Sequence, residues 1–276
     1  MKTLWFITNP HSGSATQAKC DALEAVFDEQ GLRLAGRTQF PDDPLPRAAD
    51  LAAHDVDTIV LFGGDGTINA ALCALAEWEG AFLIIPGGTM NLLARTLHGE
   101  RDPHAIVRAA QDCDRRVALP FVEAGAHRAF VGLILGPAAS WVRAREAARK
   151  RRPLRMLAAM RNAWRRTFGE NVRVSGAPGL HRGYQAVLVR PAARQLEVMG
   201  IEARDWRAIA ELGWDWLSGD WVAARAVTEA HARTLRIAGH RRVLALFDGE
   251  PIMLDAGTEV SGGTSAPRFI ATGDAA

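Results

Sequence analysis

The sequence has no long hydrophobic run, little cysteine and almost no charge imbalance. No apolar stretch reaches the roughly 20 residues that a helix needs to span a bilayer. The opening MKTLWFITNP is too short an apolar run for a signal peptide and predicts a first strand. The three cysteines, Cys20, Cys73 and Cys113, lie far apart without metal-ligand spacing, which favours reduced thiols and a cytoplasmic protein.

The composition is that of a soluble globular protein. The chain of 276 residues is 48% hydrophobic and 23% charged, so it can bury a large core and is not disordered. This length favours one or two domains. The net charge of +2 indicates little about partners.

The first 112 residues alternate short apolar runs with helical patterns. Strands are expected at TLWFIT, RLAGRTQF, DTIVLF and AFLIIP, and helices at 16–30, 45–54 and 67–78 and from Asn91. This alternation predicts an α/β fold, a parallel sheet with helices on both faces. Ligands of such sheets bind at the carboxyl ends of the strands.

Three of the expected strands end in glycine-bearing loops at that edge. The loops are NPHSGSA (9–15), GGDGT (63–67) and PGGTMN (86–91). One such loop alone could be a plain strand-to-helix turn, but three on one edge indicate a phosphate site at helix N-termini. Both the Walker pattern of a P-loop and the dinucleotide spacing of three glycines in one turn are absent. The loops offer hydroxyls and amides, and Asp65 is the carboxylate that a nucleotide's metal ion needs. The hydroxyls belong to Ser12, Thr67 and Thr89, and the amides to Asn9 and Asn91.

The pattern changes from about residue 115. Strand-like stretches follow one another from RRVALPFVEAGAHRAFVGLILG to RVLALFDGEP, with a turn at 124–127 and helical segments near 140–168 and 205–218. They predict a mostly antiparallel β domain with inserted helices. The expected domains are 1–114 and 115–265, and a last strand at 266–272 is a candidate to return to the first domain.

The segment FDGEP (247–251) carries two more carboxylates. If it is extended, Asp248 and Glu250 share one face, with Gly249 permitting close approach of a substrate. Asp-Gly is also a common hairpin turn, and the segment alone favours that alternative.

Together NPHSG, GGDGT, PGGTMN and DGE, in this order and rough spacing, resemble the diacylglycerol kinase catalytic-domain family. This family includes bacterial soluble lipid kinases and sphingosine kinases and is related to the NAD kinases. The resemblance runs from about residue 3 to 271. It implies an α/β ATP-binding domain beside a β-rich lipid-binding domain.

The resemblance also implies residue roles. Glu250 matches the family's general base, Asp248 would support the nucleotide or the metal, and Asp65 would hold ATP and its Mg2+. These three are the candidate catalytic residues. The candidate ATP-binding residues are Asn9, Pro10, Ser12, Gly13, Thr38, Gly63, Gly64, Asp65, Gly66, Thr67, Asn69, Gly88, Thr89 and Asn91.

The second domain departs from the family in its metal-binding loop. Members usually carry a loop of closely spaced aspartates that holds a structural magnesium. Here VLVRPAARQLEVMG passes almost directly from strand to strand, with Glu197 as its one acid. We therefore expect this metal site to be missing.

Residues 152–168 form a basic amphipathic pattern. Leu154, Met156, Leu157, Met160, Trp164 and Phe168 fall on one side of a helical wheel, opposite several arginines. This suits an anionic membrane surface and a peripheral location at the inner membrane face, although an ordinary surface helix shows the same pattern. Trp214, Trp216 and Trp221 suit a lipid gate or core packing. No nucleic-acid recognition motif accompanies the basic residues.

The sequence thus predicts an ATP-dependent kinase of a diacylglycerol-like lipid alcohol. Two alternatives stay open: a kinase of a soluble acceptor, as in the NAD kinases, and a nucleotide-binding regulatory module without catalysis. The oligomeric state is also open, with a homodimer as one candidate because relatives of this fold often pair.

Overall fold

The computed structural model describes residues 1–12, 15–88, 91–136, 171–201 and 227–273. The chain forms two compact units, Met1–Leu119 with Thr264–Ala276, and Pro120–Gly263. It therefore passes between the units twice. The predicted helical segments near 140–168 and 205–218 lie outside the described residues, as do the three tryptophans at 214, 216 and 221.

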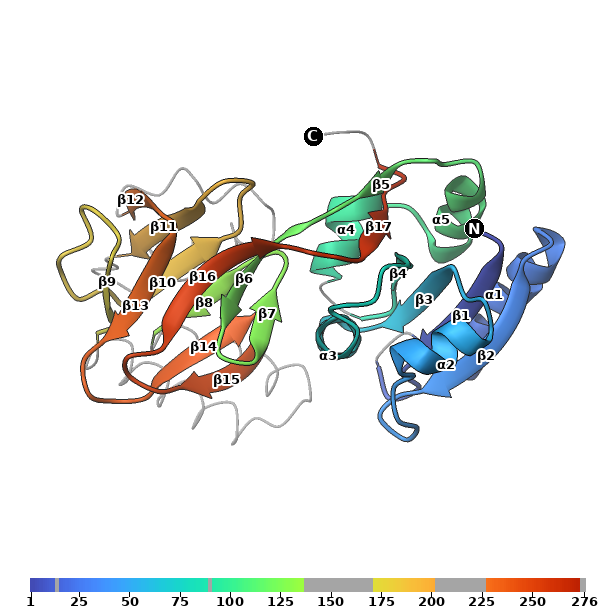
Figure 1. Cartoon of the computed structure of the whole chain (residues 1–276), viewed down its shortest axis with the longest axis horizontal. Helices are drawn as coiled ribbons and strands as arrows, with labels where there is room; N and C mark the ends of the chain where they lie inside the picture. The colour runs from blue at the N-terminus through green and yellow to red at the C-terminus, as the bar shows by residue number, and fades with distance from the viewer. Residues whose placement is uncertain (13–14, 89–90, 137–170, 202–226, 274–276) are drawn as a thin grey trace, which may run out of the picture. The chain divides into compact units, whose positions relative to one another are not determined.

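The first unit is a doubly covered α/β sheet of order β2-β1-β3-β4-β17-β5 (Figure 1). Strands β1 to β4 and β17 run parallel, and the short β5 runs antiparallel to β17. The elements are β1 (Thr3–Thr8), α1 (Gln17–Glu29), β2 (Arg33–Gln39), α2 (Ala48–Ala53), β3 (Thr58–Gly63), α3 (Asp65–Ala74), β4 (Ala81–Pro86), α4 (Leu92–His98), α5 (Pro103–Gln111), β5 (Arg116–Val117) and β17 (Arg268–Ile270).

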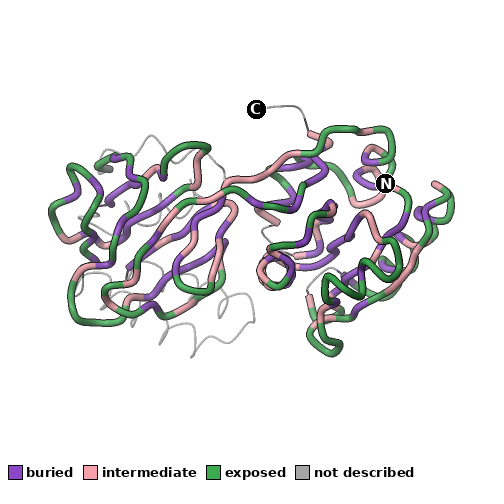
Figure 2. Tube along the Cα trace, viewed as in Figure 1, coloured by how far each residue is buried: buried purple, intermediate pink, exposed green. Residues whose placement is uncertain are grey.

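Both faces of this sheet are buried under helices. Alternate residues of β1, β3 and β4, such as Phe6 and Phe62, pack with α1 and α5 in one cluster. On the opposite face the ring of Phe82 contacts Trp78, which follows α3, and Phe269 of β17. Burial on both sides explains why β3 and β4 are near-continuous apolar runs, coloured as buried in Figure 2. The predicted α/β class is confirmed.

The second unit consists of two antiparallel sheets. One has the order β12-β11-β10-β8-β14-β15 and the other β7-β6-β16-β13-β9. The strands are β6 (Pro120–Ala124), β7 (His127–Ala129), β8 (Leu133–Leu135), β9 (Arg173–Ser175), β10 (Ala186–Arg190), β11 (Leu196–Ile201), β12 (Val227–Ala232), β13 (Thr234–Ala238), β14 (Val243–Phe247), β15 (Glu250–Leu254) and β16 (Glu259–Thr264).

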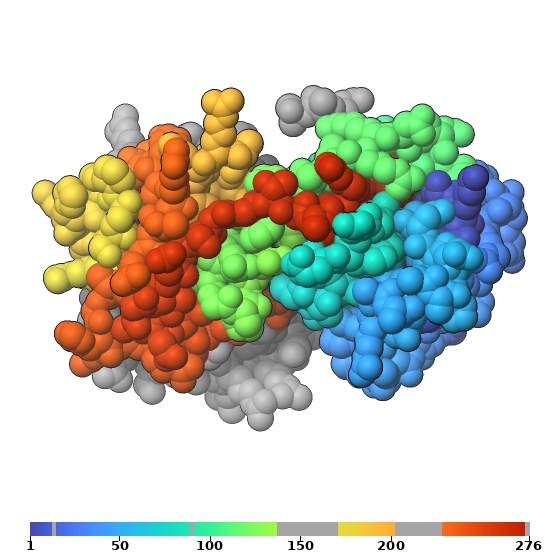
Figure 3. All heavy atoms as spheres, in the orientation of Figure 1, coloured from blue at the N-terminus to red at the C-terminus, as the bar shows by residue number. Residues whose placement is uncertain are grey.

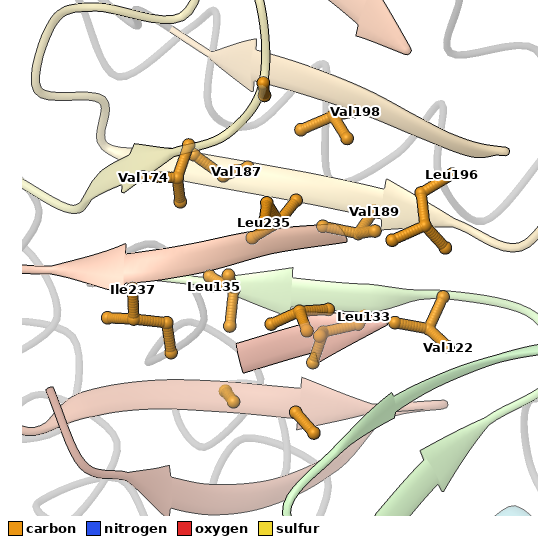
Figure 4. Close-up of a cluster of buried hydrophobic side chains, with 14 of the residues drawn as sticks. Val122, Leu133, Leu135, Val174, Val187, Val189, Leu196, Val198, Leu235 and Ile237 are labelled. Atoms are coloured by element: carbon orange, nitrogen blue, oxygen red, sulfur yellow. The ribbon is translucent and has the colours of Figure 1, made fainter. Parts of the chain in front are cut away.

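The inner faces of these two sheets share one core. Every second residue points inward, so Val122, Leu235 and Ile237 of one sheet meet Leu133, Val187 and Val198 of the other (Figure 4). Figure 3 shows the heavy atoms of both units from the same side, coloured along the chain. The predicted antiparallel β region is confirmed for the described residues.

No helix in the described part of the chain is both long enough and apolar enough to cross a membrane.

Candidate functional site

The GGDGT segment is the junction between β3 and α3. Gly63 ends the strand, Gly64 precedes the helix as its N-cap, and α3 begins at Asp65. The helix was expected over 67–78 and instead spans Asp65–Ala74. Because the backbone turns directly into the helix, Asp65 lies in its first turn, where a carboxylate is favoured by the helix dipole.

The second loop packs on GGDGT backbone to backbone. Gly87 donates its N–H to the Gly63 carbonyl at 3.0 Å. A Cβ on Gly88 would lie 2.7 Å from the Cα of Gly64, closer than Cβ atoms approach non-bonded atoms in proteins. The second loop therefore cannot accept a side chain at Gly88, where glycine is required by space.

Asp65 connects the same two loops through its carboxylate. Its Oδ2 accepts the N–H of Asn91 at 3.0 Å, and its Oδ1 accepts the N–H of Leu92 at 2.9 Å. The Asn91 side chain closes the loop, accepting from the Gly88 N–H at 2.7 Å and donating to the Gly88 carbonyl at 3.1 Å. Asp65 thus fixes the start of α4 against the start of α3.

The first loop joins this assembly through Asn9. Its Nδ2 donates to the Thr67 hydroxyl at 2.7 Å. Its carbonyl accepts the N–H of Ser12 at 3.0 Å and the Ser12 hydroxyl at 2.8 Å, which closes a tight turn. The structure thus brings Asn9, Ser12, Asp65, Thr67 and Asn91 to one edge of the sheet, and their loops interlock.

The remaining candidates in the first unit fall into three groups. Pro10 is exposed in the first loop, and Gly66 and Asn69 are half-buried in α3. Thr38 is buried within β2, where its hydroxyl accepts the indole N–H of Trp5 at 3.0 Å, so it belongs to the strand and not to the loops. Gly13 and Thr89 lie outside the described residues.

The hairpin alternative holds for the FDGEP segment. Phe247 pairs with Glu250 across the β14–β15 hairpin, and Asp248 and Gly249 form its turn. Asp248 has φ 49° and Gly249 φ 96°, the left-handed pair that a two-residue hairpin requires. The expectation that Asp248 and Glu250 lie on one face of an extended segment is wrong, because the chain reverses direction between them.

The two carboxylates of this turn differ in their surroundings. Glu250 is exposed at the first position of β15. Asp248 is only 6% exposed and accepts three backbone N–H groups, those of Phe130 at 2.8 Å, Val131 at 2.9 Å and Gly132 at 2.9 Å. The sequence gives no signal for this contact, because 116 or more residues separate the partners.

The described residues offer few metal ligands. They contain no group of three or more His, Cys, Asp or Glu side chains that could hold a metal ion. Between β10 and β11, Arg190 and Glu197 form an ion pair at 3.8 Å. A Mg2+ that arrives with nucleotide phosphates needs only one or two protein carboxylates, and Asp65 is the carboxylate of the loop assembly. The donor set fits a nucleotide-borne ion.

Glycine-rich loops interlocked at the carboxyl edge of a parallel sheet are typical of nucleotide-binding α/β proteins, and comparison with known proteins narrows this class further. Residues 3–119 match the model of the diacylglycerol kinase catalytic domain. Over these residues, nearly the whole N-terminal part of the first unit, the chain is similar to that family. The resemblance inferred from the motifs is confirmed.

Two particular proteins show how far the likeness extends. A diacylglycerol kinase of Bacillus subtilis (strain 168) is 33% identical over 124 residues, which cover 44% of this chain and 40% of that relative. The crystal structure of a diacylglycerol kinase from Bacillus anthracis str. Sterne superposes with a TM-score of 0.66 over 98% of this chain and 97% of that one. At 15% identity this second match shows a shared fold.

Two contributors to the loop assembly were absent from the sequence prediction. Gly87 and the Leu92 N–H both take part in the contacts between loops. The doubled glycine after AFLIIP is the signal that could have identified Gly87, because a second glycine is superfluous in a simple turn.

Proposed function

We propose that the chain is an ATP-dependent lipid kinase that phosphorylates a hydroxyl of a diacylglycerol-like lipid alcohol. The observation that carries this proposal is the interlocked set of loops in the first unit, which coincides with the matched family segment. The first unit would be the ATP-binding domain and the second the acceptor domain.

The loops supply what nucleotide phosphates need. Backbone N–H groups at the start of α3 point outward from the sheet, and the Ser12 and Thr67 hydroxyls and the Asn9 amide lie in the same assembly. Because these groups are already held by hydrogen bonds, they would bind phosphate without a large ordering cost. Mg2+ would neutralise charge on the transferred phosphoryl group. Asp65 would hold that ion beside the loop.

Glu250 is the proposed general base. An exposed carboxylate on a rigid hairpin can take the proton of an acceptor hydroxyl. Phosphoryl transfer depends mainly on positioned reactants and charge stabilisation, so one such group is sufficient.

We also propose that residues 152–168 bring the protein to an anionic membrane. This part rests on the sequence pattern alone, because the segment lies outside the described residues. Cosedimentation with phosphatidylglycerol vesicles should fall when Arg152, Arg155 and Arg166 are replaced by Glu, and should weaken in high salt. Equal and salt-independent vesicle binding by the unaltered chain and by the Arg→Glu variant would contradict the proposal.

The decisive experiment is ATP consumption with Mg2+ against lipid alcohols in mixed micelles and soluble acceptors including NAD. Turnover confined to one lipid class and lost in Glu250→Ala would support a lipid kinase. Turnover with NAD would establish the soluble-acceptor alternative. ATP binding without any turnover would favour the regulatory module.

A further inference from the structure

The carboxylate of Asp248 is used inside the fold. Three backbone N–H groups of the β7–β8 connection converge on it, from Phe130, Val131 and Gly132. Hydrogen bonds to an ionised acceptor are about twice as strong as neutral ones, and the side chain is almost completely buried. Both oxygens therefore serve to compensate backbone donors.

These contacts attach the hairpin turn to a neighbouring strand. β14 lies beside β8, with Phe247 opposite Leu133, so Asp248 comes level with the residues before β8. The Asp248 N–H also donates to the Gly132 carbonyl at 3.1 Å. The turn is thus held at four hydrogen bonds, three through the side chain and one through the backbone.

Glu250 follows this anchored turn directly. It pairs with Phe247, whose side chain is fully buried in the core and contacts the ring of His127. The backbone before Glu250 is therefore fixed from two sides, by the Asp248 carboxylate and by the Phe247 ring. The Glu250 side chain stays exposed at the end of this rigid support.

We propose that Asp248 is a positioning residue that acts through Glu250 and does not bind nucleotide or metal. This inference rests on the proposed function, in which Glu250 is the base. Without the carboxylate, three N–H donors of the β7–β8 connection lose their acceptor and the turn can shift. A misplacement of about 1 Å can cost a catalytic group about 100-fold in rate.

The test compares kcat, the KM for ATP and the Mg2+ concentration for half-maximal rate in matched variants. Asp248→Asn should lower kcat about 10–100-fold with little change in the other two. Gly249→Val leaves the carboxylate intact but strains a turn that needs a positive φ, and should reproduce the loss. Gly249→Asn is its control, since Asn tolerates this conformation best among side chains and nothing lies within 4 Å of the added Cβ.

A double mutant separates positioning from direct contact. If Asp248 acts through Glu250, then adding Asp248→Asn to Glu250→Gln should not lower the residual rate further. If the rate losses of the two single variants multiply in the double mutant, the inference is overturned in favour of direct binding. A raised Mg2+ requirement in Asp248→Asn together with a normal rate in Gly249→Val would overturn it in the same way.

Hydrogen exchange makes the result independent of activity. Amides of residues 130–132 should exchange faster in Asp248→Asn than in the unaltered chain, and unchanged exchange would overturn the anchoring. An altered exchange pattern with unchanged kcat would overturn positioning while leaving the kinase in place. No turnover by the unaltered chain would remove the proposed function, and this inference with it.

Discussion

Two of the candidate carboxylates, one in each unit, are held by backbone amides. Asp65 accepts two N–H groups at the start of α4, and Asp248 accepts three from the β7–β8 connection. At the residue scale, both therefore do structural work whatever ligand is bound. Asp65 adds a link between the two loops that the proposed mechanism needs close together.

Replacing Asp65 should affect stability and turnover together. In Asp65→Asn one acceptor oxygen becomes an N–H2 donor that faces a backbone donor, and an unpaired group of this kind costs about 1–3 kcal/mol. We expect the fold to survive with an unfolding free energy lower by about that amount, and turnover to be lost in both Asp65→Asn and Asp65→Ala. Urea unfolding and an ATPase assay would check this. Unchanged stability would show that the link is not needed.

The glycine contact between the loops gives a matched pair of variants. In Gly88→Ala the added Cβ would sit 2.7 Å from the Gly64 Cα, and backbone atoms cannot move aside as a flexible side chain can. In Gly64→Ala the Cβ would be 3.7 Å from the Gly88 Cα, an ordinary contact. Gly88→Ala should therefore cost at least about 1–3 kcal/mol, the usual penalty of overpacking, and Gly64→Ala clearly less. Equal losses in thermal unfolding would refute the tight contact.

His98 predicts a pH-dependent stability. It is 1% exposed at the end of α4, its Nδ1 lies 2.9 Å from the Thr272 hydroxyl, and burial is the main cause that lowers its pKa to about 4. The nearby Arg101 lowers the pKa further, while the Ile84 carbonyl raises it. The folded protein therefore keeps His98 neutral at pH values where the unfolded chain, with an ordinary pKa of 6.5, takes up a proton.

The contribution of His98 to the free energy of unfolding should therefore be constant above about pH 6.5 and fall as the pH drops toward 4. The loss between pH 7.5 and pH 5 should be about 2 kcal/mol. Urea unfolding at both pH values measures it, with His98→Leu as the variant in which most of this difference disappears. A difference of the same size in His98→Leu would assign the pH dependence to other groups.

At the scale of elements, most strands could be predicted, and several helix boundaries could not. Buried parallel strands such as β3 and β4 are continuous apolar runs, which gives them a clear signal. The single helix expected from Asn91 is instead two, α4 and α5, separated at Gly99. The pair Asp102-Pro103 is a helix-start signal that would have indicated the second helix.

The start of α5 can be tested directly. Asp102 is its N-cap, and its carboxylate accepts the N–H groups of His104 and Ala105 at 3.0 and 3.1 Å. Asp102→Ala should lower the unfolding free energy by about 1 kcal/mol. Asp112→Ala, at the other end of the same helix, is the control, because a negative charge there is not favoured by the helix dipole. Equal effects of the two substitutions would argue against capping.

Strand β16 was missed for a different reason. β16 contains Ser261, Gly262 and Gly263, residues that disfavour strands when taken by themselves. In the structure Phe121 and Leu196 pack over the two glycines, so tertiary contacts make small residues suitable there. The local sequence pattern does not indicate such a contact, because the residues that make it come from strands distant in the sequence.

At the scale of the whole molecule, alternation of elements predicted the α/β class of the first unit and the antiparallel sheets of the second. Sequence could not give the strand order, in which β17 from the end of the chain lies between β4 and β5. It identified the candidate loops because glycine pairs and polar residues directly followed strong strand signals. The Asp-Gly pair indicated a turn at Asp248 as one alternative, whereas the contacts of its carboxylate with the distant amides of residues 130–132 have no local signal.

We propose that this chain transfers phosphate to a lipid alcohol with Glu250 as base. The most direct test is transfer of labelled γ-phosphate from ATP to diacylglycerol in mixed micelles with Mg2+, compared between the unaltered chain and Glu250→Gln. We expect labelled lipid with the unaltered chain and a rate at least about 100-fold lower with the variant, because a general base is lost. Equal labelling by both proteins would remove Glu250 from the mechanism, and no label in any lipid alcohol would contradict the claim itself.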